Sequence, residues 1–364
     1  MPDRSALRGW PVWLGLSALA GAAQAQGSSV TVYGVADAYL TGIWGGAGSI
    51  TQLQSGGLSG SRLGFRGRED LGGGLYANFV LETGLNMDDG TYGQGAVFGR
   101  QSFVGVGSTS LGAVTLGRQY TGFWHVTDEF SEFSNSGNGP SSAVIGGFGG
   151  YEPVRGSLDS GTGNGGPARL NNAVKYESPV WAGFRFGMQG GFGEVVDDAS
   201  GNRVLDAYAR YAQGPVDIAA AYVDDRGGSV LPDAARRSYI VAAAYSFGNL
   251  KVRGAYLEVD DRSSFNQDGS GWWVGADYRL GTSLVKIQYV VNAPSYVSDA
   301  HTQGIGLGYE YSLSRRTTLY TSVSYFKNDV NAGLGRASFT IPSGLTTTAD
   351  NDLTQWVGGM RFTF

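Results

Sequence analysis

Titratable side chains are the first candidates for chemistry, and few of them here are nucleophiles or metal ligands. The chain has no cysteine and only two histidines, His125 and His301, so thiolate sites are excluded and little remains for a metal cluster. His125 has the acidic neighbours Asp128 and Glu129, but no spacing that specifies a nucleophile and its base. We therefore predict no catalytic site, no organic cofactor and no metal centre built on cysteine or histidine.

Basic side chains are more informative, because they recur at alternate positions of short segments. A period of two places them on one face of a β-strand. In a barrel with a lipid-facing outside, charged strand residues must point into the lumen. The basic residues expected there are Arg62, Arg66, Arg100, Arg169, Lys175, Arg185, Arg210, Lys251, Arg253, Arg279 and Lys286. The expected inward acids are fewer: Asp37, Glu82, Glu177, Asp206, Asp217, Asp277 and Glu310. For the later strands the plainer interpretation is that these charges only hydrate the lumen.

The elements that must position these charges are strands. Apolar residues alternate with small or polar ones in segments such as 272–280 and 304–311. Composition agrees, since 61 glycines and 12% aromatic residues accompany only 10 prolines. We expect about sixteen strands, near 29–42, 50–68, 74–86, 97–108, 112–119, 169–178, 183–193, 203–213, 216–224, 237–247, 250–259, 271–280, 283–291, 302–312, 317–327 and 352–364.

The connections between these strands decide between a soluble sandwich and a membrane barrel. Short turns, such as 213–215 and 280–282, alternate with longer polar connections. One rim of short turns and one rim of long loops is typical of outer-membrane barrels. The fold class expected is therefore all-β, a transmembrane antiparallel barrel of sixteen strands with a lumen too wide for side chains to fill.

The first residues indicate export. Arg4 and Arg8 precede an apolar stretch and the small-x-small site 23–25, which predicts a signal peptide over 1–25 and a barrel over 26–364. Removing Asp3, Arg4 and Arg8 leaves 24 basic and 30 acidic residues, so the formal net charge changes from −5 to −6. This balance argues against a nucleic-acid partner.

The last strand ends at an aromatic residue. Met360, Phe362 and Phe364 share one face, and we interpret Phe362 and Phe364 as the signal read by the outer-membrane barrel assembly machinery. The first strand presents Gly34, Ala36 and Ala38 outward, a surface small enough for a protein contact at a trimer axis, although these residues could also face lipid.

Paired acids stand at the starts of four long connections, at 88–89, 197–198, 224–225 and 260–261. Solvated loop charge explains them. The sharper hypothesis is that some bind Ca²⁺ or Mg²⁺ and bridge to anionic lipopolysaccharide, because hard cations favour carboxylate oxygens.

Several segments together resemble the general porins of beta-proteobacteria and neisseriae. The resemblance rests on 29–37, 55–75, 98–106, 114–120 and 169–176, in that order along the chain. One departure is that Thr363, not a basic residue, precedes the terminal aromatic Phe364. The resemblance implies a homotrimer in the Gram-negative outer membrane, with water-filled pores narrowed by a long third loop, here about 120–168.

The resemblance also implies a constriction. Arg62, Arg66 and Arg100 match arginines that line it in the similar porins, with Arg169 as a fourth. The connection would carry Asp128, Glu129 and Glu132 opposite them, while Glu82 stands on the arginine wall. A basic wall facing an acidic loop creates a transverse field across a poorly screened passage. The facing of Arg118 stays open, since its parity points outward unless the strand ends or bulges first.

We expect a passive channel for small hydrophilic solutes and ions, with weak to moderate anion selectivity. Two alternatives stay open: an outer-membrane lipase or protease barrel, which would have to use His125 or His301, and an adhesin whose activity lies in the loop near 328–351.

Overall fold

The computed structural model describes residues 29–45, 48–134, 139–141, 168–194, 196–197, 203–226, 236–262, 268–332 and 352–364. The expected signal peptide 1–25 lies outside these ranges, as does most of the 328–351 connection. Among the described residues, no helix is both long and apolar enough to cross a membrane.

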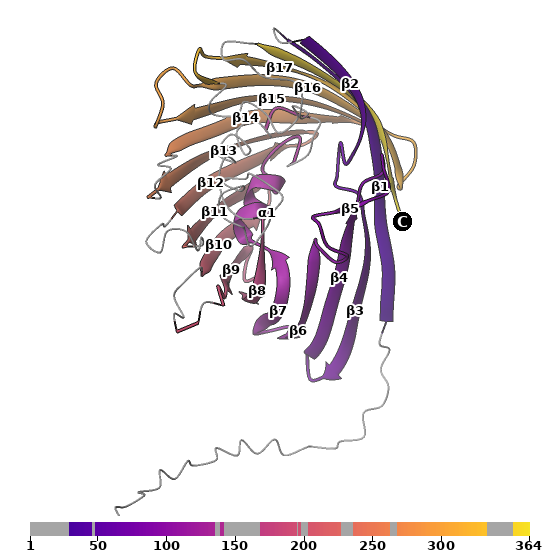
Figure 1. The fold of residues 1–364 in the computed structure, drawn as a ribbon. Helices are drawn as coiled ribbons and strands as arrows, with labels where there is room; N and C mark the ends of the chain where they lie inside the picture. The colour runs from indigo at the N-terminus through magenta and orange to yellow at the C-terminus, as the bar shows by residue number, and fades with distance from the viewer. Residues whose placement is uncertain are drawn as a thin grey trace, which may run out of the picture.

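One antiparallel sheet closes on itself as a ring of strands (Figure 1). Its strands are β1 (Ser29–Gly45), β2 (Gly48–Ser55), β3 (Arg62–Gly72), β4 (Leu75–Leu85), β5 (Tyr92–Gly93), β6 (Gln101–Ser108), β7 (Gly112–Tyr120), β8 (Arg169–Glu177), β9 (Phe184–Gly191), β10 (Val204–Gln213), β11 (Val216–Asp225), β12 (Arg236–Phe247), β13 (Leu250–Asp261), β14 (Gly269–Leu280), β15 (Ser283–Pro294), β16 (Thr302–Ser312), β17 (Thr317–Asn328) and β18 (Leu353–Thr363). A single helix, α1 (Gly122–Glu129), is described.

Eighteen strands occupy sixteen positions in the wall. β2 and β3 pair with successive parts of β1, so together they occupy one strand position with an interruption between them. β5 and β6 likewise pair with successive parts of β4 and share one position. The sixteen-stranded closed barrel predicted from the sequence is confirmed. The expected strand 50–68 is observed as β2 and β3, which span 48–55 and 62–72 with an interruption at 56–61.

The ring closes where β1 pairs with β18, from Val35 opposite Thr363 to Gly45 opposite Leu353. Closure leaves no open sheet edge, which matters because an unpaired backbone group in lipid costs several kcal/mol. Both chain ends of the barrel therefore lie at one seam.

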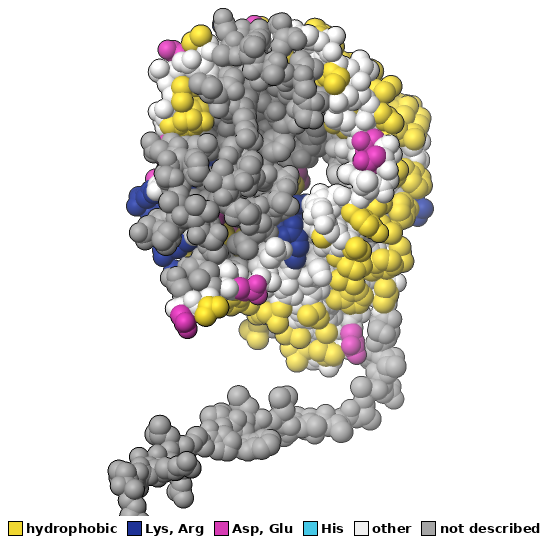
Figure 2. Space-filling model, in the orientation of Figure 1, with side chains coloured by type: hydrophobic (Ala, Val, Ile, Leu, Met, Phe, Trp, Pro, Cys, Tyr) yellow, Lys and Arg dark blue, Asp and Glu magenta, His cyan; other side chains and the backbone are white. Residues whose placement is uncertain are grey.

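Alternation in the sequence reappears as alternation in exposure, with apolar residues outside. On β16, Ile305, Leu307 and Tyr309 are exposed, while the glycines between them are buried. Figure 2 shows hydrophobic side chains gathered over the outer surface on the side of β1 to β4. A barrel that exposes its apolar face is built for a lipid environment.

The largest buried apolar cluster lies between α1 and the inner wall. Phe123, Val126 and Phe130, from the connection after β7, cluster with wall residues that include Ile240 and Trp273. Small inward residues make room for this packing: Ala219, Ala221, Ala242, Ala244 and Ala255. The described part of the connection therefore packs against the inner face of the barrel, and Figure 1 shows α1 within the ring of strands.

The expectation that every strand charge points inward is wrong at one end of β11 to β13. Asp224 and Arg237 share the outward face of the exposed residues Ile218 and Val241, and Arg237 Nε lies 3.4 Å from Asp224 Oδ2. This end carries the long connections, where a strand leaves the apolar layer. Outward charge is tolerated there because polar surroundings begin.

Candidate pore constriction

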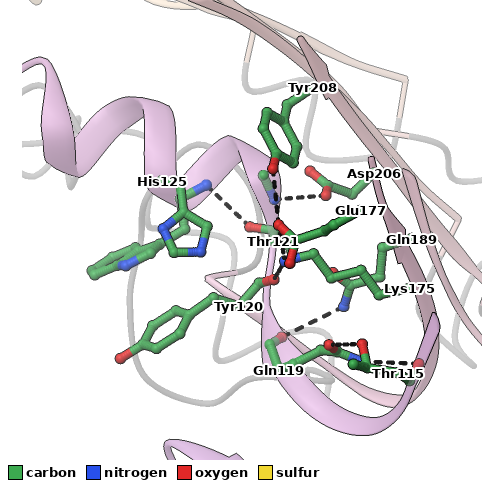
Figure 3. Close-up of polar contacts among 12 residues, drawn as sticks. Thr115, Gln119, Tyr120, Thr121, His125, Lys175, Glu177, Gln189, Asp206 and Tyr208 are labelled. Atoms are coloured by element: carbon green, nitrogen blue, oxygen red, sulfur yellow. Dashed lines mark hydrogen bonds and ion pairs between the residues drawn. The ribbon is translucent and has the colours of Figure 1, made fainter. Parts of the chain in front are cut away.

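The barrel wall fixes the start of α1 by accepting hydrogen bonds from the first backbone N–H groups of the helix (Figure 3). Asp206, on the inner face of β10, accepts hydrogen bonds from Gly122 N at 2.7 Å and Phe123 N at 3.0 Å. Thr121 supplies the N-cap, its hydroxyl accepting from Trp124 N at 3.1 Å. Together these contacts satisfy three N–H groups that a helix leaves unpaired, and they set where the connection enters the lumen.

Tyr120 joins two of the expected constriction arginines. Its hydroxyl accepts hydrogen bonds from Arg100 at 2.5 Å and from Arg169 at 2.8 Å. The Arg169 guanidinium also lies over the Tyr120 ring, 4.3 Å from its centroid. The hydroxyl and the ring face both favour nearby cations, so one tyrosine holds two like charges together.

Glu82 neutralises part of this basic group. Its carboxylate accepts a 2.8 Å hydrogen bond from Arg100 Nε and a 2.9 Å bond from the Tyr33 hydroxyl. Arg100 and Arg169 are 7% and 2% exposed, so other protein atoms cover them. They act on the lumen through their electrostatic potential and not by direct contact with solutes.

Arg62 and Arg66 are the two members of the group that reach water. Arg62 is half-buried and Arg66 is exposed, with its guanidinium 5.1 Å from the Tyr33 ring centroid. Neither forms an ion pair with any described acid. The charges that act on Arg62 include Arg100, Glu82 and Asp128, so one acid of the connection acts electrostatically on this wall.

The other two acids of the connection face a different part of the wall. Glu129 forms an ion pair with Arg210, which is also held by Asp217 through two 2.7 Å bonds. Glu132 lies 3.5 Å from Arg253 and accepts a 2.8 Å hydrogen bond from Gln288. Glu129 and Glu132 thus contact Arg210 and Arg253, whereas Asp128 acts electrostatically on Arg62 and Arg100.

Burial changes the titration of two groups on the connection. It raises the pKa of Glu132 to about 7, against the opposing effect of the Arg253 charge. It lowers the pKa of His125 to about 4, and the Lys175 charge adds to the effect. His125 also lies 3.7 Å from Glu129, and no described serine or threonine hydroxyl bonds to its ring.

An inward loop between β2 and β3 was not foreseen. The Asp37 carboxylate accepts hydrogen bonds from the backbone N–H groups of Gly57, Leu58 and Ser59, at 2.9 to 3.1 Å. The loop places Gly60 directly against Arg100: a Cβ added at Gly60 would lie 2.9 Å from the Arg100 guanidinium. The Gly and Ser run that interrupts the alternation at 56–61 was the available signal.

Arg118, whose facing the sequence left open, lies in a β-bulge. The register between β7 and β8 shifts between Gly117 and Gln119, and Gly117 has a φ of +128°. Only glycine adopts such a backbone readily. Arg118 Nε donates to the Gly99 carbonyl at 2.7 Å, and its guanidinium bonds the Asn171 side chain at 2.6 Å.

The paired acids have arginine partners where they are described at the ends of β11 and β13. Asp224 bonds Arg226 and Arg237, and Asp260 bonds Arg262 at 2.9 Å. Across the described ranges, no group of three or more acidic or histidine side chains is arranged to hold a metal ion.

The small residues of β1 lie at the closing seam. Gly34 exchanges backbone hydrogen bonds with Phe364, and a Cβ on Gly34 would lie 2.3 Å from the Phe364 ring. Ala36 and Ala38 are half-buried and pair with Phe362 and Met360. The terminal aromatic therefore covers Gly34, while the two alanines stay partly open.

The model of the Gram-negative porin family matches residues 13–331. The chain belongs to this family. It is 32% identical to outer membrane porin protein 32 of Delftia acidovorans, over 88% of this chain and 90% of the relative. It is 30% identical to an outer membrane porin protein of Bordetella pertussis, over 86% of this chain and 92% of that one.

Comparison with solved structures also finds porins. An anion-selective porin from Comamonas acidovorans superposes with a TM-score of 0.79 at 29% identity, covering 93% of this chain and all of the other. OmpT of Vibrio cholerae in its trimer form gives a TM-score of 0.65 at 18% identity, over 93% of this chain and all of the other, a likeness of fold alone.

The protein is therefore an outer-membrane porin of the beta-proteobacterial type, a water-filled channel and not an enzyme. Porins pass solutes through the lumen, so the charges described above lie along the path.

Proposed function

We propose that this porin is a weakly to moderately anion-selective diffusion channel. Its constriction would lie between the wall that carries Arg62, Arg66, Arg100 and Arg169 with Glu82, and the connection that carries Asp128, Glu129 and Glu132. The observation that supports this most is that Arg62 and Arg66 reach water without an ion pair to any described acid, whereas Glu129 and Glu132 are held in pairs. The similar Comamonas porin is described as anion-selective.

The charge balance gives the physical reason for the preference. A narrow, low-dielectric passage screens charge poorly, so unpaired cations raise the local anion concentration. Arg100 and Arg169 add positive potential from behind Tyr120. Asp128 opposes them, which limits the selectivity to a moderate value.

The test is the reversal potential of single channels in a potassium chloride gradient. The wild type should favour chloride, and Arg62→Gln with Arg66→Gln should lower the chloride-to-potassium permeability ratio about threefold. Arg68→Gln is the matched control, because Arg68 shares the same strand but stacks on Tyr76, 3.5 Å from the ring centroid. A wild-type potential that favours potassium would refute the proposal.

The assembly proposed is a homotrimer that contacts lipopolysaccharide. Ala36 and Ala38 offer a small, partly open surface beside the seam, which suits close packing between copies. Phe362 and Phe364 would serve as the signal for the barrel assembly machinery, and residues 1–25 as the exported chain's signal peptide. Arg226, Arg237 and Arg262, together with their ion-pair partners Asp224 and Asp260, would form the charged rim that meets the lipopolysaccharide headgroups.

A further inference from the structure

Two cavities adjoin on the inner wall, on the side of the short turns. The first has a volume of about 410 Å³ and lies between the described part of the connection and four strands, with a lining that includes Glu132, Arg210, Lys251, Arg253 and Lys286. The second, of about 580 Å³, lies at the turns after β14 and β16 and is lined in part by Arg315 and Arg361. Arg279 and Leu284 line both.

Basic residues outnumber acidic ones along these cavities, seven against five. Most of the acids are already paired: Glu129 with Arg210, Glu132 and Asp277 with Arg253, and Glu310 with Lys286. The fifth acid, Asp128, acts electrostatically on Arg62 and Arg100. The other four basic residues, Lys251, Arg279, Arg315 and Arg361, form no ion pair with any described residue, and Arg361 donates a hydrogen bond to Ser59. The excess charge is therefore concentrated on these four.

The strand register places two of these cations beside each other. Lys251 on β13 lies opposite Asp277 on β14, and Arg279 is two residues further along β14 on the same inner face. Diagonal neighbours of this kind have backbones roughly 7–8 Å apart, within reach of two long side chains. Asp277, which lies between them, forms its ion pair with Arg253. Asp277 and Asp217 also act electrostatically on Lys251, but neither forms an ion pair with it, so both cations keep donors free for an anion.

The geometry points to a binding site for small dianions, formed by Lys251 and Arg279 on the short-turn side of the inserted connection. Two cations at this separation can each contact one end of a dicarboxylate, or both contact one tetrahedral oxyanion. The Arg279 guanidinium presents paired donors that match carboxylate or phosphate oxygens. Arg315, in the adjoining cavity, would receive the anion on its way to the mouth.

The site is separate from the proposed constriction. Arg62 and Arg66 lie on β3, whereas Lys251 and Arg279 lie on β13 and β14, and neither cavity is lined by the β3 arginines. It rests on the lumen being the solute path, which the family establishes, and not on the selectivity proposed for Arg62. Binding should be weak because water screens both side chains, which suits a site that must release its ion.

The experiment is single-channel recording in potassium chloride with sulfate added as the dianion. Sulfate should reduce the wild-type chloride current in a saturable way, whereas the same concentration of acetate should not. Lys251→Gln with Arg279→Gln should raise the half-effect concentration of sulfate about tenfold, because both charge contacts to the anion are lost. Normal channel openings would show that the variant folds.

Two further variants make the result specific. Arg68→Gln with Lys327→Gln removes one arginine and one lysine that line neither cavity, and it should leave the sulfate effect unchanged. Lys251→Arg with Arg279→Lys keeps both charges and should retain at least part of the effect. Undiminished inhibition by sulfate in the Lys251→Gln, Arg279→Gln channel would overturn the site, whatever the reversal potential of the Arg62→Gln, Arg66→Gln channel shows.

Discussion

The carboxylate of Asp206 on β10 accepts a 2.7 Å hydrogen bond from the backbone N–H of Gly122 at the start of α1. This contact crosses from the barrel wall to the connection inside it. It is buried, and a second bond to Phe123 N makes the carboxylate a two-point anchor. A hydrogen bond to a buried charged acceptor contributes more than one between neutral groups, about 1.5–3 kcal/mol.

Replacing this anchor should loosen α1. In Asp206→Ala the helix loses both acceptors, so we expect more frequent current fluctuations in single-channel records and a lower unfolding temperature. Asp206→Asn keeps one acceptor oxygen, so its current fluctuations and unfolding temperature should lie between those of the wild type and Asp206→Ala. An Asp206→Ala channel as quiet as the wild type would show that the remaining contacts hold α1 alone.

Tyr120→Phe removes the hydroxyl that accepts hydrogen bonds from both Arg100 and Arg169. The two guanidinium groups then lose a shared acceptor in a buried place, which should lower the free energy of unfolding by about 1–3 kcal/mol. Thermal denaturation monitored by circular dichroism measures this. Tyr76→Phe, whose ring lies under Arg68, serves as the control and should change stability little.

Exposure predicts an order among the arginines. Arg62→Gln should reduce chloride preference, because Arg62 reaches water, whereas Arg169→Gln should act mainly on stability, because Arg169 is 2% exposed and bonded to Tyr120. Reversal potentials and unfolding temperatures of both variants distinguish the effects. Equal loss of selectivity from the two changes would contradict this division.

Glu132 should make selectivity depend on pH near neutrality. Burial raises its pKa to about 7, so the folded state favours the neutral form, and the stability from that form is present at pH below the ordinary glutamate pKa and is lost as pH rises through about 7. The carboxylate gained above pH 7 makes the lumen less positive. Chloride preference should therefore fall between pH 5 and 8, about twofold.

The control for the pH effect is Glu132→Gln, which stays neutral and should remove most of the change. His125 cannot produce it, because its pKa is lowered to about 4. Reversal potentials measured from pH 5 to pH 8 on both channels provide the comparison. A pH response that survives in Glu132→Gln would assign it to another carboxylate.

Gly34→Ala should disturb closure of the barrel. The added methyl would lie 2.3 Å from the Phe364 ring, so the ring must move away from β1. We expect less assembled protein in the membrane fraction. Ala36→Leu, which enlarges the partly open surface next to it, should instead lower the proportion of trimers on seminative gels while leaving monomer folding intact.

The strands and the lumen charges could be predicted because both follow from a local pattern. A period of two identifies a strand, and lipid on one side decides which face carries Arg253 or Lys286. The break at 56–61 was readable as a polar run, but its inward fold depends on Asp37, which is some twenty residues away in the chain.

The pairing of charges could not be predicted, because it depends on contacts between residues far apart in the chain and not on a local pattern. Glu129 meets Arg210 and Glu132 meets Arg253 because α1 is anchored at Asp206, more than eighty residues further along the chain. Nothing local to the connection specifies that anchor. The role of Tyr120 was not predicted, because a tyrosine at the end of a strand is ordinarily an interfacial residue. Only the structure shows that its hydroxyl accepts hydrogen bonds from two arginines.

The seam between β1 and β18 has a consequence for the order of events in biogenesis. Strand β1 pairs on one side with β2 and β3, which follow it directly in the chain, but its partner on the other side is β18, so this second neighbour is present only when the last residues are made. A chain truncated before Leu353 would leave β1 with unpaired backbone groups, each costing several kcal/mol in lipid. Closure of the barrel therefore requires the full chain length, and a product that lacks β18 could not form this seam.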